Sequence, residues 1–219
     1  MSKDPLGLKK FIRTVDNFPI DGIAFRDITS LIETPEAFVK TCDELTKITR
    51  NFGADIVASI ESRGFIFAGT IARDLNLPFV LARKPGKLPN ETYKKSFDLE
   101  YGSTSIEIQK NTEIKNNQKI VIVDDLVATG GTAIACSEIF TENFNVKSEN
   151  ILILSIIDLP ELGGSKLISE KGYLIETLID YWYGLCMNKE FGRLMVDIEG
   201  ICLSDEDKLL IENKHIGGI

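Results

Sequence analysis

Segment 121–132 contains the side chains best suited to chemistry. It opens with an apolar run, reaches two adjacent carboxylates at Asp124 and Asp125, and continues into a loop with two glycines and two threonines. Ligands bind beyond the carboxyl ends of strands in open α/β sheets, and carboxylates placed there can accept hydrogen bonds from sugar hydroxyls. A glycine loop that leads into a helix can bind a phosphate through backbone N–H groups and the positive end of the helix dipole. The segment therefore predicts a cradle for a ribose 5-phosphate.

Other phosphate-binding motifs fit this segment poorly. It lacks the lysine of a Walker A loop, and the chain has no G-x-G-x-x-G, which argues against nucleotide hydrolysis and dinucleotide binding. An acidic strand end followed by a solvated turn is the simplest alternative. Two carboxylates directly beside a threonine-glycine anion nest disfavour that alternative.

The elements that must position this motif follow an α/β pattern. Apolar runs without alternation predict strands at 55–60, 77–81, 119–123 and 151–157. Helical spacing between them predicts helices at 64–75 and from about 131 to 140. Buried strands separated by helices indicate a central, mostly parallel sheet flanked by helices on both faces.

Two further helices and one irregular segment complete the pattern. Asp4 and Pro5 begin a predicted amphipathic helix that continues to Val15, and a second helix starts at 34–35 and stops at Gly53. Segment 84–105 is rich in lysine, glutamate, proline and glycine and then alternates, which predicts a long flap or hairpin.

Composition excludes several classes of function. The net charge of −8, with an isoelectric point near 4.9, opposes nucleic-acid binding, which depends on many lysine and arginine contacts to phosphates. The four cysteines are widely spaced and His215 is the only histidine, so no zinc site is expected and reduced thiols in the cytoplasm are favoured. The longest aliphatic run, 151–157, is too short to span a membrane.

Segment 121–132 resembles the phosphoribosyl pyrophosphate signature of type I phosphoribosyltransferases. Three further stretches narrow the resemblance to the adenine phosphoribosyltransferases. Segment 18–29 (FPIDGIAFRDIT) resembles their N-terminal hood, and 61–65 (ESRGF) resembles their pyrophosphate loop. Segment 83–89 (RKPGKLP), which leads to 99–102 (LEYG), resembles their flexible catalytic loop. The likeness runs in order from about residue 11 to residue 181 and so covers most of the chain.

The resemblance implies a type I phosphoribosyltransferase-like domain over 1–181, with a hood at about 1–34 and a flexible loop at about 88–103. Residues 182–219 form an extension to which it gives no role. It assigns Glu100 to catalysis; Asp124 and Asp125 to the ribose hydroxyls; Ala128, Thr129, Gly130, Gly131 and Thr132 to the 5-phosphate; Ser62, Arg63, Arg83, Lys84 and Lys87 to pyrophosphate; and Ala24, Phe25, Arg26 and Leu159 to adenine.

The activity implied by the resemblance is purine salvage, in which adenine and phosphoribosyl pyrophosphate give AMP and pyrophosphate. The chain shows no metal cage of its own, so Mg²⁺ is expected to arrive with phosphoribosyl pyrophosphate. The family also implies a homodimer and a cis peptide between Glu61 and Ser62. The same reaction on hypoxanthine, guanine or xanthine is one alternative. A regulator that senses phosphoribosyl pyrophosphate is another, disfavoured by the acidic charge and by the presence of Glu100.

Overall fold

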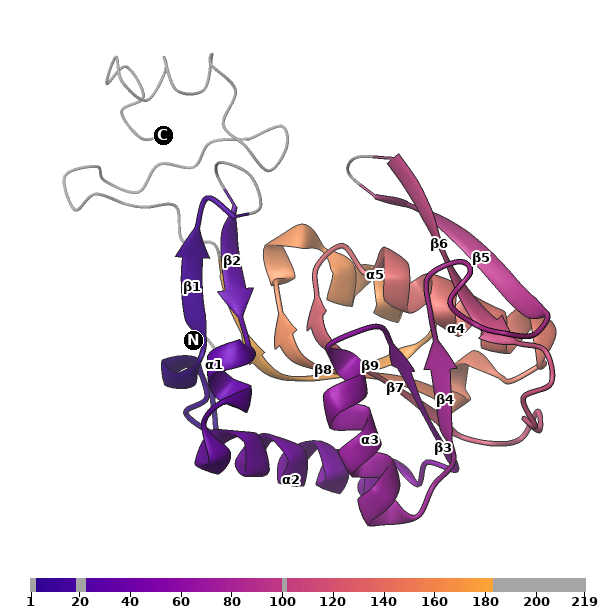
Figure 1. Cartoon of the computed structure of the whole chain (residues 1–219), viewed down its shortest axis with the longest axis horizontal. Helices are drawn as coiled ribbons and strands as arrows, with labels where there is room; N and C mark the ends of the chain where they lie inside the picture. Colours follow the sequence, from indigo (N-terminus) through magenta and orange to yellow (C-terminus); the bar gives the residue numbers. More distant parts are fainter. Residues whose placement is uncertain (1–2, 19–22, 100–101, 183–219) are drawn as a thin grey trace. The chain divides into compact units, whose positions relative to one another are not determined.

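Five parallel strands form the central sheet of the computed structural model, which describes residues 3–18, 23–99 and 102–182 (Figure 1). The strand order is β4 (Phe79–Ala82), β3 (Ile56–Ile60), β7 (Ile120–Val127), β8 (Ile151–Asp158) and β9 (Leu174–Asp180). The predicted parallel α/β sheet is confirmed.

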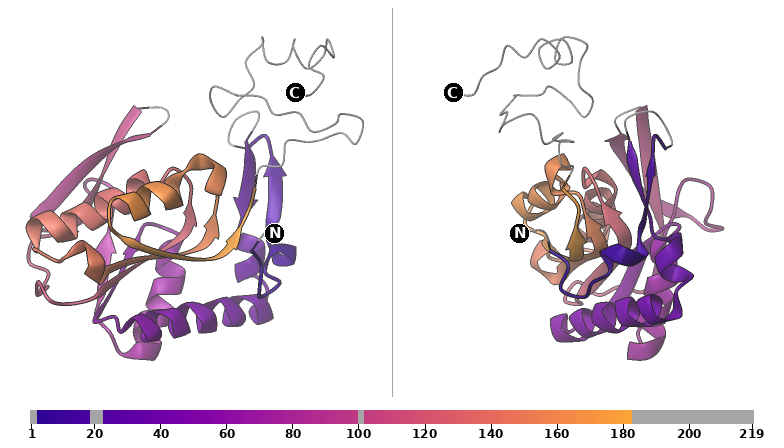
Figure 2. Two further views of the ribbon diagram at one scale, coloured as in Figure 1. Left: turned by 180° about the vertical axis from the view of Figure 1, so that it is seen from behind. Right: turned by 90° about the vertical axis from the view of Figure 1, so that its left-hand side faces the viewer.

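Helices cover both faces of this sheet. Helices α2 (Pro35–Phe52) and α3 (Gly64–Leu75) lie on one face, and α4 (Gly131–Asn143) and α5 (Gly164–Glu170) lie on the other (Figures 1 and 2). The predicted stop of α2 is confirmed at Gly53, whose φ of 74° is left-handed, the conformation in which glycine commonly ends helices. The short elements are α1 (Thr29–Ile32), η1 (Lys9–Phe11), η2 (Ser148–Asn150) and η3 (Pro160–Leu162).

The middle strands of the sheet form the core. Every residue of β3 and β8 is buried, as the non-alternating apolar runs predict for strands covered on both faces. Full burial of a leucine or isoleucine side chain contributes about 1.5–3 kcal/mol relative to exposure. Cys42 on α2 and Cys136 on α4 are buried free thiols, whereas Cys186, Cys202 and His215 lie outside the described residues.

A hairpin of β5 (Thr92–Leu99) and β6 (Gly102–Gln109) interrupts the α/β pattern and confirms the predicted flap or hairpin. It rests on α4 through an ionic cluster centred on Lys95, whose Nζ lies 3.1 Å from Glu138 Oε2 and 2.5 Å from Glu142 Oε1. The base of the hairpin is therefore tied to the helix that follows the predicted phosphate loop. Glu100 lies outside the described residues.

The predicted amphipathic helix through Val15 is wrong. Asp4 does cap a turn, because its carboxylate accepts the N–H of Leu8 at 2.7 Å, but only the short helix η1 follows. Val15 instead lies on β1 (Arg13–Asp16), which pairs with β2 (Ala24–Asp27) in a two-stranded sheet. Strand pairing and the β-branched residues of this segment override its helical spacing.

The structure divides into two units, and residues 14–26 belong to a smaller unit than the one that contains the central sheet. Within this smaller unit, the rings of Phe18 and Phe25 meet edge to face with centroids 5.1 Å apart. In the described part of the chain, no helix has the length and apolar character needed to cross a membrane.

Candidate active site

Asp124 and Asp125 lie in the last four residues of β7, as the motif predicts for the carboxyl end of a strand. The chain then passes through a loop at 128–130, and α4 begins at Gly131. Gly130 occupies the N-cap position with a left-handed φ of 81°, a conformation that strongly favours glycine. The carboxylates, the glycine loop and the N-terminus of a 13-residue helix are therefore consecutive, which confirms the predicted arrangement.

The two carboxylates have different surroundings. The Asp125 side chain is buried, and its Oδ2 lies 2.8 Å from Arg63 Nε in an ion pair whose angle does not make a hydrogen bond. Asp124 Oδ1 accepts the backbone N–H of Asp125 at 2.9 Å. Burial raises the pKa of Asp124 well above its usual value, and the neighbouring Asp125 charge raises it further.

Ser62 and Arg63 form the loop that faces this motif across the sheet edge, between β3 and α3. The peptide bond between Glu61 and Ser62 is cis, as the resemblance implies. Packing fixes the loop against β7 at Gly64, where an added Cβ would lie 2.7 Å from Val123 O and 3.1 Å from the Asp124 Cα. The absence of a side chain at this position lets the start of α3 lie close against β7.

A cavity of about 530 Å³ lies between these loops and the hairpin. Its lining includes Ser62 and Arg63 from one loop, Asp124 and Asp125 from β7, and Thr132 from α4. Lys84 follows β4, and Phe97, Thr104, Ser105 and Ile106 belong to the hairpin. Residues assigned from the sequence to ribose, 5-phosphate and pyrophosphate thus surround one space.

The segment after β4 is held by two glutamates to which the sequence analysis gives no role. Arg83 Nε donates to Glu61 Oε2 at 2.9 Å, and the backbone N–H of Lys84 donates to the same carboxylate at 2.6 Å. Glu107 accepts the backbone N–H of Gly86 at 3.2 Å. Glu61 belongs to the motif that holds Ser62 and Arg63, so its position was visible in the sequence, whereas its contact with Arg83 was not.

Arg83 is occupied within its own chain in this structure. Besides the Glu61 ion pair, its Nη1 donates to the carbonyl oxygen of Lys87 at 3.2 Å. The guanidinium that the resemblance assigns to pyrophosphate therefore organises the turn at 83–87. Lys84, by contrast, lines the cavity.

The residues that the resemblance assigns to adenine lie on β2 and directly after β8. Ala24, Phe25 and Arg26 are half-buried on β2, and Arg26 Nη1 donates to the hydroxyl of Thr14. Leu159 follows β8 and is buried, with its N–H donating to Val127 O at 3.0 Å beside the end of β7.

Comparisons with known proteins agree with this geometry. The phosphoribosyl transferase domain model matches residues 29–174. The adenine phosphoribosyltransferase of Agathobacter rectalis is 43% identical over 174 residues, a match that spans 80% of this chain and 97% of that protein. The chain belongs to the adenine phosphoribosyltransferase family.

Solved structures of the family have the same fold. The adenine phosphoribosyltransferase of Thermoanaerobacter pseudethanolicus matches with a TM-score of 0.73 at 38% identity, over 80% of this chain and 98% of that one. The Giardia lamblia enzyme, solved with 9-deazaadenine, matches with a TM-score of 0.72 at 34% identity, over 80% of this chain and 96% of that one. The type I phosphoribosyltransferase fold inferred from the sequence is confirmed.

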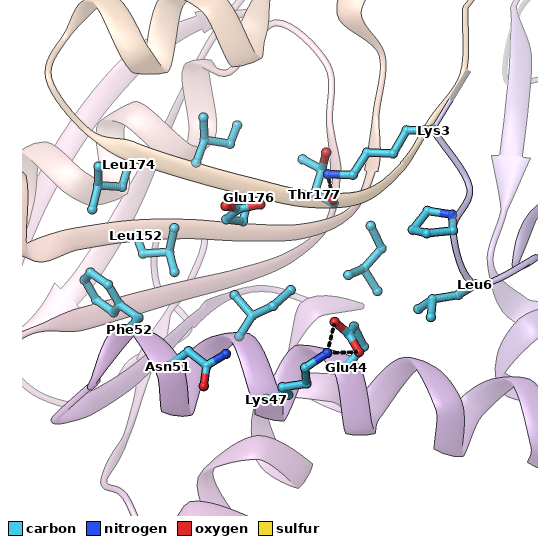
Figure 3. Close-up of a pocket in the computed structure, with 14 residues that line it drawn as sticks. Lys3, Leu6, Glu44, Lys47, Asn51, Phe52, Leu152, Leu174, Glu176 and Thr177 are labelled. Atoms are coloured by element: carbon cyan, nitrogen blue, oxygen red, sulfur yellow. Dashed lines mark hydrogen bonds and ion pairs between the residues drawn. The ribbon is translucent and has the colours of Figure 1, made fainter. Parts of the chain in front are cut away.

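A larger cavity of about 730 Å³ lies away from the family's signature motifs, between α2, β9 and the N-terminal segment (Figure 3). Phe52, Leu152 and Leu174 provide apolar walls. The Lys47 ammonium is paired with Glu44 at 3.0 Å, and the Lys3 ammonium donates to Thr177 O. This groove holds none of the residues assigned to substrate.

Proposed function

We propose that the chain transfers the 5-phosphoribosyl group of phosphoribosyl pyrophosphate to adenine, which forms AMP and releases pyrophosphate. The observation that supports this most directly is the single cavity lined by Asp124, Asp125, Thr132, Ser62 and Arg63. In the reaction, the bond from the anomeric carbon to pyrophosphate breaks with its electron pair leaving on oxygen. A bond forms from a ring nitrogen of adenine, which loses a proton.

The ribose phosphate is held by consecutive parts of one motif. Asp124 and Asp125 accept hydrogen bonds from the ribose hydroxyls at the end of β7. The N–H groups of loop 128–132 and the hydroxyls of Thr129 and Thr132 donate to the 5-phosphate. The α4 N-terminus adds about half a positive charge, which favours the dianion at this position.

Pyrophosphate lies against the opposite loop in this proposal. Ser62 and Arg63 donate to its oxygens, and Lys84 and Lys87 contribute positive charge near the same edge. Arg83 reaches pyrophosphate only if its ion pair with Glu61 opens. Fixed donors that stabilise charge on the leaving group can supply a large part of a rate enhancement.

Mg²⁺ fits the oxygen donors of the site. Mg²⁺ prefers one or two carboxylates together with substrate phosphates and waters, and Asp124 and Asp125 line the cavity that would hold the pyrophosphate. The bound ion would neutralise charge on the leaving diphosphate. The protein's own part is to orient the two carboxylates, which the end of β7 does.

Adenine binding is assigned to β2 and to the residue after β8. The family resemblance assigns stacking on the base to Phe25, contacts with the amine edge to backbone groups of Ala24 and Arg26, and apolar contact with the ring to Leu159. Glu100 handles the proton, and closure of loop 88–103 excludes water, the competing nucleophile.

The proposal also includes a homodimer in the cytoplasm. Ile66 on α3 and Leu81 on the edge strand β4 are large apolar side chains that are 42% and 38% exposed. Phe65 and Phe79, on the same two elements, meet edge to face with ring centroids 5.9 Å apart. The buried free thiols Cys42 and Cys136 suit a reducing compartment. Sedimentation of wild type and of Leu81→Lys tests the dimer, since a charge at this exposed apolar position should give monomers.

Turnover with a panel of nucleobases tests the function. Purified protein is incubated with Mg²⁺, phosphoribosyl pyrophosphate and either adenine, hypoxanthine, guanine or xanthine. Adenine should react at least tenfold faster than hypoxanthine, because each mismatched buried polar group costs about 1–3 kcal/mol. Equal turnover would overturn the adenine assignment and leave the transferase. Binding of phosphoribosyl pyrophosphate without turnover of any base would favour a regulator.

A further inference from the structure

Gly164, the first residue of α5, lies directly against the loop proposed to bind the 5-phosphate. Its backbone N–H donates to Ala128 O at 3.1 Å. Earlier in the same connection, the N–H of Leu159 donates to Val127 O at 3.0 Å. The chain between β8 and α5 therefore runs beside the end of β7 and the start of the loop, joined to them by backbone hydrogen bonds.

No side chain fits at Gly164 without movement of the backbone. A Cβ at this position would lie 2.2 Å from Ala128 O, 2.6 Å from Gly130 N and 2.8 Å from Thr129 C. Non-bonded carbons pack at about 3.5–4.0 Å, so all three contacts are severe overlaps. Because every atom involved belongs to the backbone, none can rotate away.

The contact is reciprocal. A Cβ at Gly130 would lie 3.0 Å from Gly164 O and 3.1 Å from Gly164 Cα. Gly130 is the N-cap of α4 in a left-handed conformation, so the turn that aims N–H groups at the phosphate packs backbone to backbone on the start of α5. The preceding residue, Gly163, has no atom within 4 Å of an added Cβ, which confines the steric requirement to Gly164.

Of the two segments in this contact, loop 128–130 can move more easily than helix α5. Helix α5 is anchored by Ile168, which is 0% exposed and belongs to the core. Thr129 on the loop is exposed. A group larger than hydrogen at Gly164 should therefore displace the phosphate loop rather than the helix.

We propose that Gly164 is a positioning residue for the 5-phosphate. It allows α5 to support loop 128–130 at the position where the loop N–H groups can bind the phosphate. The inference rests on the proposed function, because it requires that the loop binds the 5-phosphate of the substrate.

The test is Gly164→Ala, with Gly69→Ala as the matched control. Gly69 lies within α3 and has no atom within 4 Å of an added Cβ, so its replacement should be harmless. Gly164→Ala should weaken ribose 5-phosphate binding in calorimetry roughly tenfold or more and raise the KM for phosphoribosyl pyrophosphate to a similar extent, since misplacement by about 1 Å can cost about 100-fold. The KM for adenine should change little. Unchanged ribose 5-phosphate affinity in a folded Gly164→Ala protein would overturn the proposal.

A second pair of variants applies if Gly164→Ala does not fold. Ile168→Ala removes buried side-chain atoms that pack α5 against the core. Leu45→Ala makes a comparable cavity under α2, because both side chains are 0% exposed. Each substitution should cost about 2–5 kcal/mol of stability. Only Ile168→Ala should weaken ribose 5-phosphate binding, and equal binding by both variants would overturn the positioning role.

Failure of the proposed function is recognised from the wild-type protein, by its ribose 5-phosphate binding and its turnover of the bases. If wild type binds ribose 5-phosphate but converts no base, the transferase assignment fails and the calorimetric comparison at Gly164 still decides the inference. If wild type does not bind ribose 5-phosphate at all, both fail together.

Discussion

Arg63 Nε lies 2.8 Å from Asp125 Oδ2, which joins the residue assigned to pyrophosphate with a residue assigned to ribose. The carboxylate side chain is 8% exposed, whereas the guanidinium side chain is 40% exposed. A buried charge requires a partner, so Arg63 supports Asp125 before any ligand binds.

This relationship predicts a coupling between the two side chains in stability. Arg63→Ala should lower the free energy of unfolding by about 1–3 kcal/mol, because the Asp125 carboxylate loses its compensating charge. The same substitution in an Asp125→Asn background should cost less. Urea denaturation of both single variants and the double variant measures the coupling. The exposed pair Lys166 and Glu170 serves as control and should show little coupling. Additive costs for Arg63 and Asp125 would contradict the prediction.

The Asp124 carboxyl predicts how the free energy of unfolding depends on pH. Burial raises its pKa above the usual 3.8, so the folded state keeps a proton that the unfolded chain has already lost. The free energy of unfolding should therefore fall as the pH rises from about 3.8 through the raised pKa. Asp124→Asn cannot ionise, so its stability should fall less across that range.

Denaturation of wild type and Asp124→Asn at a series of pH values measures this difference. Asp43→Asn is the control, because Asp43 is exposed on α2. Parallel pH profiles for wild type and Asp124→Asn would show that the Asp124 carboxyl has no unusual titration in the folded protein.

Much of the sheet could be predicted from the sequence because its strands are buried on both faces. The unbroken apolar run of β8 has few interpretations other than a covered parallel strand. The carboxylates of β7 and the start of α4 at Gly131 follow from the same local logic. Local patterns were sufficient where burial and glycine placement determine the structure.

The sequence was a poor guide where the structure depends on distant partners. Val15 lies at helical spacing from Leu8, yet pairing between β1 and β2 places it on a strand. Helix α5 has seven residues and begins at the second of two adjacent glycines, a pair that normally marks a turn. The ion pair between Glu61 and Arg83 joins positions 22 residues apart and depends on the packing of β3 beside β4.

Gly64 yields a packing prediction on the other side of the site from Gly164. An added Cβ would lie 2.5 Å from Ser59 Oγ and 2.7 Å from Val123 O, between β3 and β7. Gly64→Ala should therefore cost about 1–3 kcal/mol of stability, the range for overpacked cores. Gly69→Ala in the same helix should be neutral or slightly stabilising. Thermal unfolding of the two variants measures the contrast, and equal melting temperatures would refute it.

The last prediction distinguishes a role in the chemical step, proposed for Glu100, from a role in substrate binding, proposed for Asp124. Glu100→Gln keeps the size and hydrogen-bonding capacity of the side chain but removes the base, so kcat should fall by about 10²–10⁴-fold. AMP affinity should change little, because the proposal assigns the ribose and phosphate of the nucleotide to β7 and the loop after it and not to Glu100. Asp124→Asn should show the opposite pattern, with weaker binding of ribose 5-phosphate itself. Single-turnover kinetics and calorimetry on both variants measure the split. Full activity in Glu100→Gln would mean that another group takes the proton from adenine, and the side chains that line the cavity beside Asp124 would be the next candidates.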